Sequence, residues 1–363
     1  MQETNSSLIS SGIRWVKNLL TSLFLGANIC TILLLWISCG STLISTSSYP
    51  ILSLLGLAFP GFVLANIGFV LFWIIFKWRY VWVPLLGMLV VSTYILDYYP
   101  IHFQQEECPD STLTILSYNA GGATGDNHEQ ILDLWKKTQP DLICLQEFAG
   151  GWISDDGTKA WMDSMQYQTM QNNGLWIISR LPIVSDSIPI HYPTRSNHSL
   201  ACLIAYQGDS VLVINNHLES NHIDPGEKES MKTALKYPQK ETVEENGRLL
   251  KNRLTEAAKF RGDQTDTICA LIDRYAEHSM VVCGDFNDTP ISYTYQRINS
   301  RLKNAYRESG RGIGITYNQK GFFVRIDHIF LSNDWKSYNT YIDNQITASD
   351  HYPLITIIGK ETK

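Results

Sequence analysis

The feature that most constrains this chain is a run of 59 residues without a charged side chain or a histidine. The run lies between Lys17 and Lys77 and is dominated by apolar residues. A water-soluble domain carries charged groups throughout its surface, so a run of this length has to face lipid. The sequence therefore predicts membrane-spanning helices.

Three spans are predicted, at about 19–38, 51–76 and 80–96. Polar residues and a proline at 40–50 separate the first two spans. Each of these is long enough for a bilayer core about 30 Å thick, at about 1.5 Å of rise per residue. The third span ends at Asp97 and is near the short limit, but aromatic residues flank both of its ends, as is typical of membrane interfaces.

The positions of the few cations predict the topology. Arg14 and Lys17 precede the first span, and Lys77 and Arg79 lie between the second and third. By the positive-inside rule, these segments face the cytoplasm, so an integral plasma- or inner-membrane protein is expected with everything after Asp97 extracytoplasmic. If the chain has two spans in place of three, everything after Asp97 would instead lie in the cytoplasm. A cleaved signal peptide would explain only the first stretch.

A polar linker at 98–110 separates this anchor (1–97) from a second region at 111–363. Short apolar runs there predict strands at 113–118, 141–146, 175–179, 200–206, 211–216, 280–284, 323–331 and 354–358. Helical spacing is found at 128–138 and at 243–276, where Gly262 is a possible break. The pattern predicts a layered α/β sandwich. The segment 223–246 is expected to be a solvated surface loop, with a lid as the alternative.

Polar side chains follow several of the predicted strands. Asn and carboxylate oxygens at such positions suit Mg²⁺ or Mn²⁺, and histidines add groups that titrate near neutral pH. Singly, each has an ordinary structural explanation as a turn residue, a helix cap or a buried histidine. Their order along the chain is more specific. The residues are Asn119, Glu147, His217, Asp285, Asn287, Asp350 and His351.

The motifs around these residues resemble those of the endonuclease/exonuclease/phosphatase superfamily, which includes deoxyribonuclease I, neutral sphingomyelinases and inositol polyphosphate 5-phosphatases. The resemblance covers nearly all of 111–363 and none of the first hundred residues. The matching segments are Ser117-Tyr118-Asn119, Pro140 to Glu147, Ile178 to Ile183, Asn215-Asn216-His217-Leu218, Gly284-Asp285-Phe286-Asn287, Arg325 to Ile329, and Ser349 to Leu354.

The resemblance implies a four-layered α/β sandwich of two packed, mostly antiparallel sheets flanked by helices. It also implies roles in phosphoester hydrolysis. Glu147, Asn119 and Asp350 would hold the divalent ion. His351, oriented by Asp327, or Asp285 would activate water. Asn287 and His217 would bind the phosphate oxygens, and Asn215 would support the site.

One position departs from the superfamily pattern. Many DNA-cleaving members have a second polar residue two positions after the first-motif asparagine, and here that position is Gly121. The metal shell is therefore expected to be thinner or completed by water, and a close match to abasic-site nucleases is disfavoured.

These observations favour a membrane-anchored, Mg²⁺- or Mn²⁺-dependent phosphodiesterase of the nuclease or lipid-phosphodiesterase type. A phosphomonoesterase and a non-catalytic binding protein on the same fold are the alternatives. The expected partners are the bilayer and a phosphoester, either nucleic acid or a lipid headgroup, with no obligate protein partner. The region after Asp97 has a net charge of −8, which counts modestly against a broad cationic surface for nucleic acid.

Overall fold

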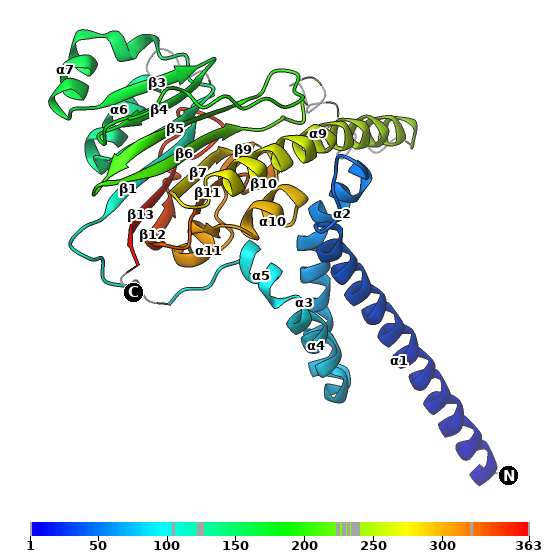
Figure 1. Ribbon diagram of the computed structural model, residues 1–363. Helices are drawn as coiled ribbons and strands as arrows, with labels where there is room; N and C mark the ends of the chain where they lie inside the picture. Colours follow the sequence, from blue (N-terminus) through cyan, green and yellow to red (C-terminus); the bar gives the residue numbers. More distant parts are fainter. Residues whose placement is uncertain are drawn as a thin grey trace.

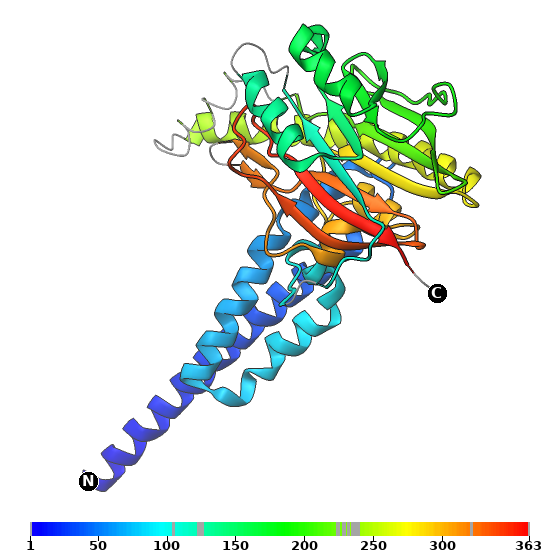
Figure 2. The same cartoon turned by 90° about the vertical axis from the view of Figure 1, so that its left-hand side faces the viewer.

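The N-terminal helices form a bundle that projects from the rest of the chain (Figures 1 and 2). The computed structural model describes residues 2–103, 106–121, 127–222, 226, 230, 233, 240–319 and 322–361. The bundle consists of α1 (Gln2–Ser41), η1 (Pro50–Leu52), α2 (Ser53–Leu57), α3 (Phe59–Phe76), η2 (Trp78–Tyr80), α4 (Trp82–Val90) and α5 (Ser92–Tyr98).

Two segments of the bundle are long and apolar enough to cross a membrane, Gly12–Ser41 and Pro50–Phe76. The third predicted span, 80–96, is not one straight helix. It is the pair α4 and α5, which are bent by 71° at a short break and together could make one further span. Polar side chains join the helices by hydrogen bonds, because an unpaired polar group in an apolar environment is costly. Asn28 donates to Asn66 at 3.2 Å, and Trp36 donates to the Gly87 carbonyl at 2.8 Å.

Residues 111–361, here called the sheet domain, contain two sheets packed face to face (Figure 1). The six-stranded sheet has the order β12 (Trp335–Ile342), β13 (Leu354–Lys360), β1 (Leu113–Asn119), β2 (Leu142–Gln146), β4 (Leu175–Ser179), β3 (Gln168–Asn172). The five-stranded sheet has the order β5 (Ser199–Tyr206), β6 (Asp209–His217), β7 (Ser279–Asp285), β11 (Asp327–Leu331), β8 (Lys303–Asn304). A hairpin of β9 (Tyr317–Gln319) and β10 (Phe322–Val324) stands apart.

Helices cover the outer faces of both sheets, which gives the expected four layers. The six-stranded sheet packs against α6 (Asn127–Thr138), η3 (Gly151–Ser154) and α7 (Asp156–Ser164), with Trp135 at the centre of that layer. The five-stranded sheet packs against α9 (Lys240–Arg274) and α10 (Tyr293–Asn299), and α11 (Ala305–Ser309) lies beside β12. Alternating strand residues such as Ile115, Val213 and Ile329 fill the core between the sheets.

Two local predictions about the sheet domain are wrong. Gly262 does not break its helix, since α9 is continuous. The run 323–331 is not one strand, because β10 ends at Val324 and β11 begins at Asp327. Of the expected loop or lid at 223–246, residues 240–246 are instead the first turns of α9, and of residues 223–239 only 226, 230 and 233 are described.

The bundle is docked tightly onto the sheet domain. A Cβ atom on Gly262 would lie 2.5 Å from the backbone nitrogen of Ser47, and one on Gly56 would lie 1.9 Å from the carbonyl oxygen of Ile291. Ile291 is buried in the same apolar cluster as the bundle residues Leu35 and Phe59. Backbone therefore meets backbone at this interface, at a distance that only glycine allows.

Charged groups fix a second contact between the two parts. The carboxylate of Asp97, at the end of α5, accepts from Gln296 at 2.9 Å and lies 3.3 Å from Nε of Arg307. The buried guanidinium of Arg325 donates to the carbonyl oxygens of Asp97 and Tyr98. The bundle is thus joined to the sheet domain at α9, α10 and α11 together.

We predict that Gly262→Ala loosens this docking. The added methyl group has to displace backbone, and overpacking of this kind costs about 1–3 kcal/mol. The melting temperature of the full chain in detergent should fall by several degrees. Gly247→Ala on the same helix is the matched control, because no atom lies within 4 Å of its added Cβ. The melting temperature of Gly247→Ala should stay at the parent value or rise. Equal melting temperatures for Gly262→Ala and Gly247→Ala would contradict the tight interface.

Candidate functional site

Two pairs of parallel strands bring polar residues to one edge of the sandwich. β1 is parallel to β2, so Asn119 is level with Gln146, the residue before Glu147. β6 is parallel to β7, so His217 is level with Asp285, and the antiparallel partner β11 places Asp327 opposite Asp285. Parallel neighbours end at the same edge, which explains why these residues converge.

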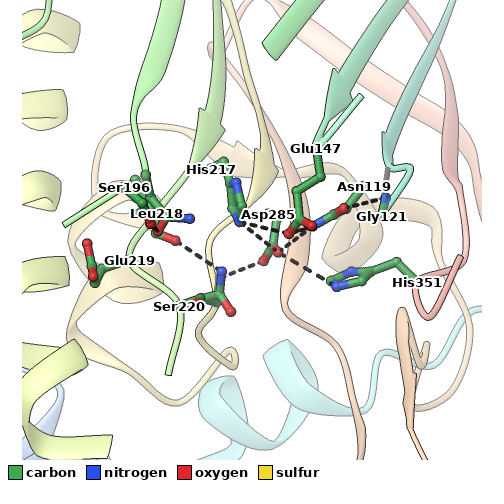
Figure 3. A network of polar contacts seen from close by, with 12 residues as sticks. Asn119, Gly121, Glu147, Ser196, His217, Leu218, Glu219, Ser220, Asp285 and His351 are labelled. Carbon is green, nitrogen blue, oxygen red and sulfur yellow. Dashed lines mark hydrogen bonds and ion pairs between the residues drawn. The ribbon is translucent and has the colours of Figure 1, made fainter. Parts of the chain in front are cut away.

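The side-chain amide of Asn119 joins the two sheets at this edge (Figure 3). Its Nδ2 donates to Glu147 Oε1 at 3.1 Å and to Asp285 Oδ2 at 3.0 Å, while its Oδ1 accepts from the Gly121 backbone at 3.0 Å. Glu147 has a positive φ of 50°, and its side chain is 48% exposed. A buried amide thus holds one exposed and one buried carboxylate together.

Two imidazoles flank the same carboxylates. His217 Nε2 lies 3.4 Å from Glu147 Oε1 and 3.8 Å from Asp285 Oδ2. His351 Nε2 lies 3.7 Å from Asp285 Oδ2, and its Nδ1 donates to Asp327 Oδ2 at 2.8 Å. His351, Asp285 and Asp327 are all buried. The structure therefore brings together six of the predicted site residues in one network.

Burial and neighbouring charges shift the pKa values in this network. Burial alone would lower the pKa of His351, but the carboxylates of Asp327, Asp285 and Asp350 raise it to about 10. Burial raises the pKa of Asp285, and the Asp327 carboxylate raises it further, against the opposing effect of the two histidines. The charged form of Asp285 is therefore favoured by the two neighbouring imidazoles and opposed by its burial.

The side chains of three predicted residues have other partners, although the backbone of Asn287 donates to Asp285 Oδ1 at 2.8 Å. Asn287 has a positive φ of 51° and donates from Nδ2 to the Leu218 carbonyl at 3.0 Å. Asp350 accepts from Gln319 at 3.1 Å, and its Oδ1 lies 3.7 Å from where a Cβ on Gly121 would be. Asn215 is fully buried and bonded to Gln146 and to two backbone carbonyls, and its supporting role stays a prediction.

The donor set fits a divalent cation. Glu147 and Asp285 offer hard oxygens on either side of the Asn119 amide, and Glu147 is accessible. Asp285, Asp327 and His351 also place one ligand atom each within 4.8 Å of one another. Asn119 itself turns its amide nitrogen, not its oxygen, toward the carboxylates. Its predicted role as a metal ligand therefore stays a prediction.

A buried polar cluster behind His217 was not predicted from the sequence. Glu219 is fully buried and accepts from Thr194 at 3.0 Å and from His222 at 2.8 Å. Arg261 on α9 donates to the Glu219 carbonyl and pairs with Asp288 at 3.3 Å. The only local signal for this cluster is an arginine within the apolar stripe of α9.

Tyr317 is a second residue that the sequence did not indicate. Its ring packs edge-on against the imidazole of His351, with the ring centroids 5.0 Å apart. β9 and residue 351 are also joined by an isolated β-bridge. Because this contact joins segments 34 residues apart, no spacing in the chain points to it.

A family model described as the endonuclease/exonuclease/phosphatase family matches residues 116–351, and a model described as a domain of unknown function matches residues 21–98. No curated protein matches the chain. Among solved structures, truncated Caenorhabditis elegans TDP2 is 16% identical, with 69% of this chain and 99% of that chain covered and a TM-score of 0.47. The endonuclease/exonuclease/phosphatase from Bacteroides vulgatus is 16% identical, with 69% of this chain and 100% of that chain covered and a TM-score of 0.49. The human Nocturnin catalytic domain is 17% identical, with 69% of this chain and 95% of that chain covered and a TM-score of 0.48. The family match includes the whole polar network described above.

We predict that His328, behind the site, makes stability depend on pH. Burial lowers the pKa of His328 to about 3, and its Nε2 donates to the Asp288 carbonyl at 2.9 Å. Below about pH 6.5 the unfolded chain binds a proton that the folded chain does not, so stability falls as pH falls toward 3. Between pH 6 and 4 this one group contributes a slope of about 1.4 kcal/mol per pH unit.

His328→Gln keeps a donor for Asp288 and removes the titrating ring. Its melting temperature should therefore depend less steeply on pH between 6 and 4 than that of the parent chain, whatever its value at neutral pH. Parallel curves for the two proteins would contradict a neutral buried imidazole at this position.

Proposed function

Because the chain belongs to the endonuclease/exonuclease/phosphatase family, we propose that it is a membrane-anchored, divalent-metal-dependent phosphoesterase that hydrolyses a phosphodiester. The observation that carries this proposal is the Asn119 amide, which holds Glu147 and Asp285 together at 3.1 and 3.0 Å, with two imidazoles beside them. Carboxylates for a cation and imidazoles for an anion are thus placed around one point, as phosphoester hydrolysis requires.

Each residue of the network has a proposed role in attack by water. Glu147 and Asn119 would hold the ion, with Asp350 beside the Gly121 turn. A bound Mg²⁺ or Mn²⁺ would offset charge on the phosphate oxygens and the leaving group. His217 and Asn287 donate to the non-bridging oxygens as charge develops on them.

The attacking water forms a new bond to phosphorus while the opposite ester bond breaks. Its proton passes to Asp285, or to His351 in its neutral form, and the facing atoms of these two groups are 3.7 Å apart. Asp327 holds His351 through Nδ1 and thereby directs Nε2 toward Asp285. The proton acceptor is therefore one of two adjacent groups in the same buried pair.

We propose an integral membrane protein with an anchor at 1–97, a linker at 98–110 and an extracytoplasmic catalytic region at 111–363. In both views α4 and α5 return the chain to the end of the bundle that is far from the N-terminus (Figures 1 and 2). The connection between α3 and α4 lies at the opposite end, toward the N-terminus (Figures 1 and 2). It carries Lys77 and Arg79 in the sequence, as the positive-inside rule expects of a cytoplasmic connection.

The full chain in detergent is predicted to hydrolyse bis-p-nitrophenyl phosphate in the presence of Mg²⁺ or Mn²⁺. EDTA should abolish turnover, and added metal should restore it. Glu147→Gln and His351→Ala should each lower kcat/KM by about 10²–10⁴-fold, because the first loses an ionic ligand and the second a charged donor or base.

Glu277→Gln is the control for the charge change, since Glu277 is exposed near the start of β7, the end opposite to Asp285. It should retain parent activity. p-Nitrophenyl phosphate in parallel separates a phosphomonoesterase from a phosphodiesterase. The proposal would be overturned if neither compound is hydrolysed in a metal-dependent way. It would also be overturned if Glu147→Gln and His351→Ala both keep full activity.

A further inference from the structure

Exposed apolar side chains gather at one corner of the sheet domain. In the described part of the chain after Tyr98, seven large apolar side chains are exposed, and two of them, Val184 and Val243, lie away from this corner. The other five are Ile101, Phe103, Ile313, Phe323 and Tyr341. We call the region formed by 99–103, 310–315, the β9–β10 hairpin and the end of β12 the apolar corner.

The apolar corner is bonded to the chain where it leaves the N-terminal bundle. The backbone of Gly312 donates to the Pro100 carbonyl at 3.0 Å, and His102 donates to the Gly310 carbonyl at 2.7 Å. Arg325 donates both to Ile313 O at 2.7 Å and to Tyr98 O at 3.3 Å. Because Tyr98 ends α5, the last helix of the bundle, this corner lies next to the bilayer surface if the bundle spans the membrane.

A cavity of about 550 Å³ opens in the apolar corner. Its apolar lining includes Phe323 and Ile342, and its polar lining includes the amides of Asn318 and Asn339. Arg311 also lines it, and no ion pair joins its guanidinium to a carboxylate of the described residues. A free guanidinium with amides and an apolar rim suits a ligand that has an anionic or hydroxylated part and an apolar part.

The cavity shares a wall with the catalytic network. Tyr317 packs against His351, whereas Asn318, the next residue of β9, lines the cavity. The Asn318 backbone donates to Asp350 O at 2.8 Å, and Tyr352, which also lines the cavity, donates to Thr316 O at 2.7 Å. Since neighbouring strand residues point to opposite faces, one layer of backbone separates the cavity from the site.

We infer that the apolar corner is a lipid subsite, and that the substrate is a phosphoester lipid of the bilayer in which the chain is anchored. The inference rests on the proposed phosphoesterase function and names its substrate class. Phe323, Ile313 and Phe103 enter the membrane interface, while Arg311 and the cavity amides bind the polar part of the lipid beside the phosphate. The net charge of −8 after Asp97 opposes nucleic acid as the occupant.

The test uses the full chain in vesicles made of equal parts phosphatidylethanolamine, phosphatidylglycerol, phosphatidylinositol and sphingomyelin. Lipid products are measured by mass spectrometry, and turnover of bis-p-nitrophenyl phosphate is measured on the same vesicles. Phe323→Ser and Arg311→Gln should each slow lipid hydrolysis by about tenfold or more, as expected when one buried aromatic or one charged contact is lost. Both should leave turnover of the soluble compound unchanged.

Val184→Ser is the matched control, because Val184 is 53% exposed and Phe323 is 55% exposed. It should leave both rates unchanged. Parent turnover of bis-p-nitrophenyl phosphate without hydrolysis of any of the four lipids overturns the lipid subsite and leaves the phosphoesterase function standing. The lipid subsite is also overturned if Phe323→Ser and Arg311→Gln both hydrolyse lipid at the parent rate. It is overturned as well if each variant loses the same fraction of its rate on lipid and on bis-p-nitrophenyl phosphate. No turnover of either substrate by the parent chain refutes the phosphoesterase function itself.

Discussion

The packing of two sheets face to face is the constraint on which the rest of the structure depends. Each sheet contains one parallel pair, β1 with β2 and β6 with β7, and the core between the sheets holds these pairs together. Their carboxyl ends therefore meet at one edge of the sandwich. Asn119 can reach Glu147 in its own sheet and Asp285 in the other only because this core fixes the spacing. The polar network is thus positioned by the apolar core between the two sheets.

Electrostatics inside the network follows from the same packing. Asp285 and Asp327 are buried side by side, an arrangement that costs free energy unless a positive group lies between them. His351 supplies that charge. A divalent ion held by the accessible Glu147 would add positive charge beside the same carboxylates. The stability of the site and its chemistry are therefore coupled through the same few side chains.

Local signals in the sequence were sufficient for the family, the fold class and most of the strands. Motifs such as Gly284 to Asn287 identify strand ends directly, because a polar residue after an apolar run is visible in the chain itself. The bend between α4 and α5, the continuity of α9 through Gly262 and the Glu219–Arg261 cluster were not predictable in this way. Each depends on contacts between segments far apart in the chain. Gly262, for example, is compatible with a helix break until Ser47 is known to lie against it.

The close approach of backbones at Gly56 and Gly262 has a consequence for how such an enzyme meets its substrate. A catalytic region on a flexible tether samples a volume, whereas one clamped to its transmembrane bundle stays at one height and one tilt. If the bundle spans the membrane and the substrate is a lipid of that bilayer, as inferred above, encounters between the two become a lateral search in two dimensions. The rate depends on the number of substrate molecules per area of membrane, and dilution of the surrounding solution leaves it unchanged.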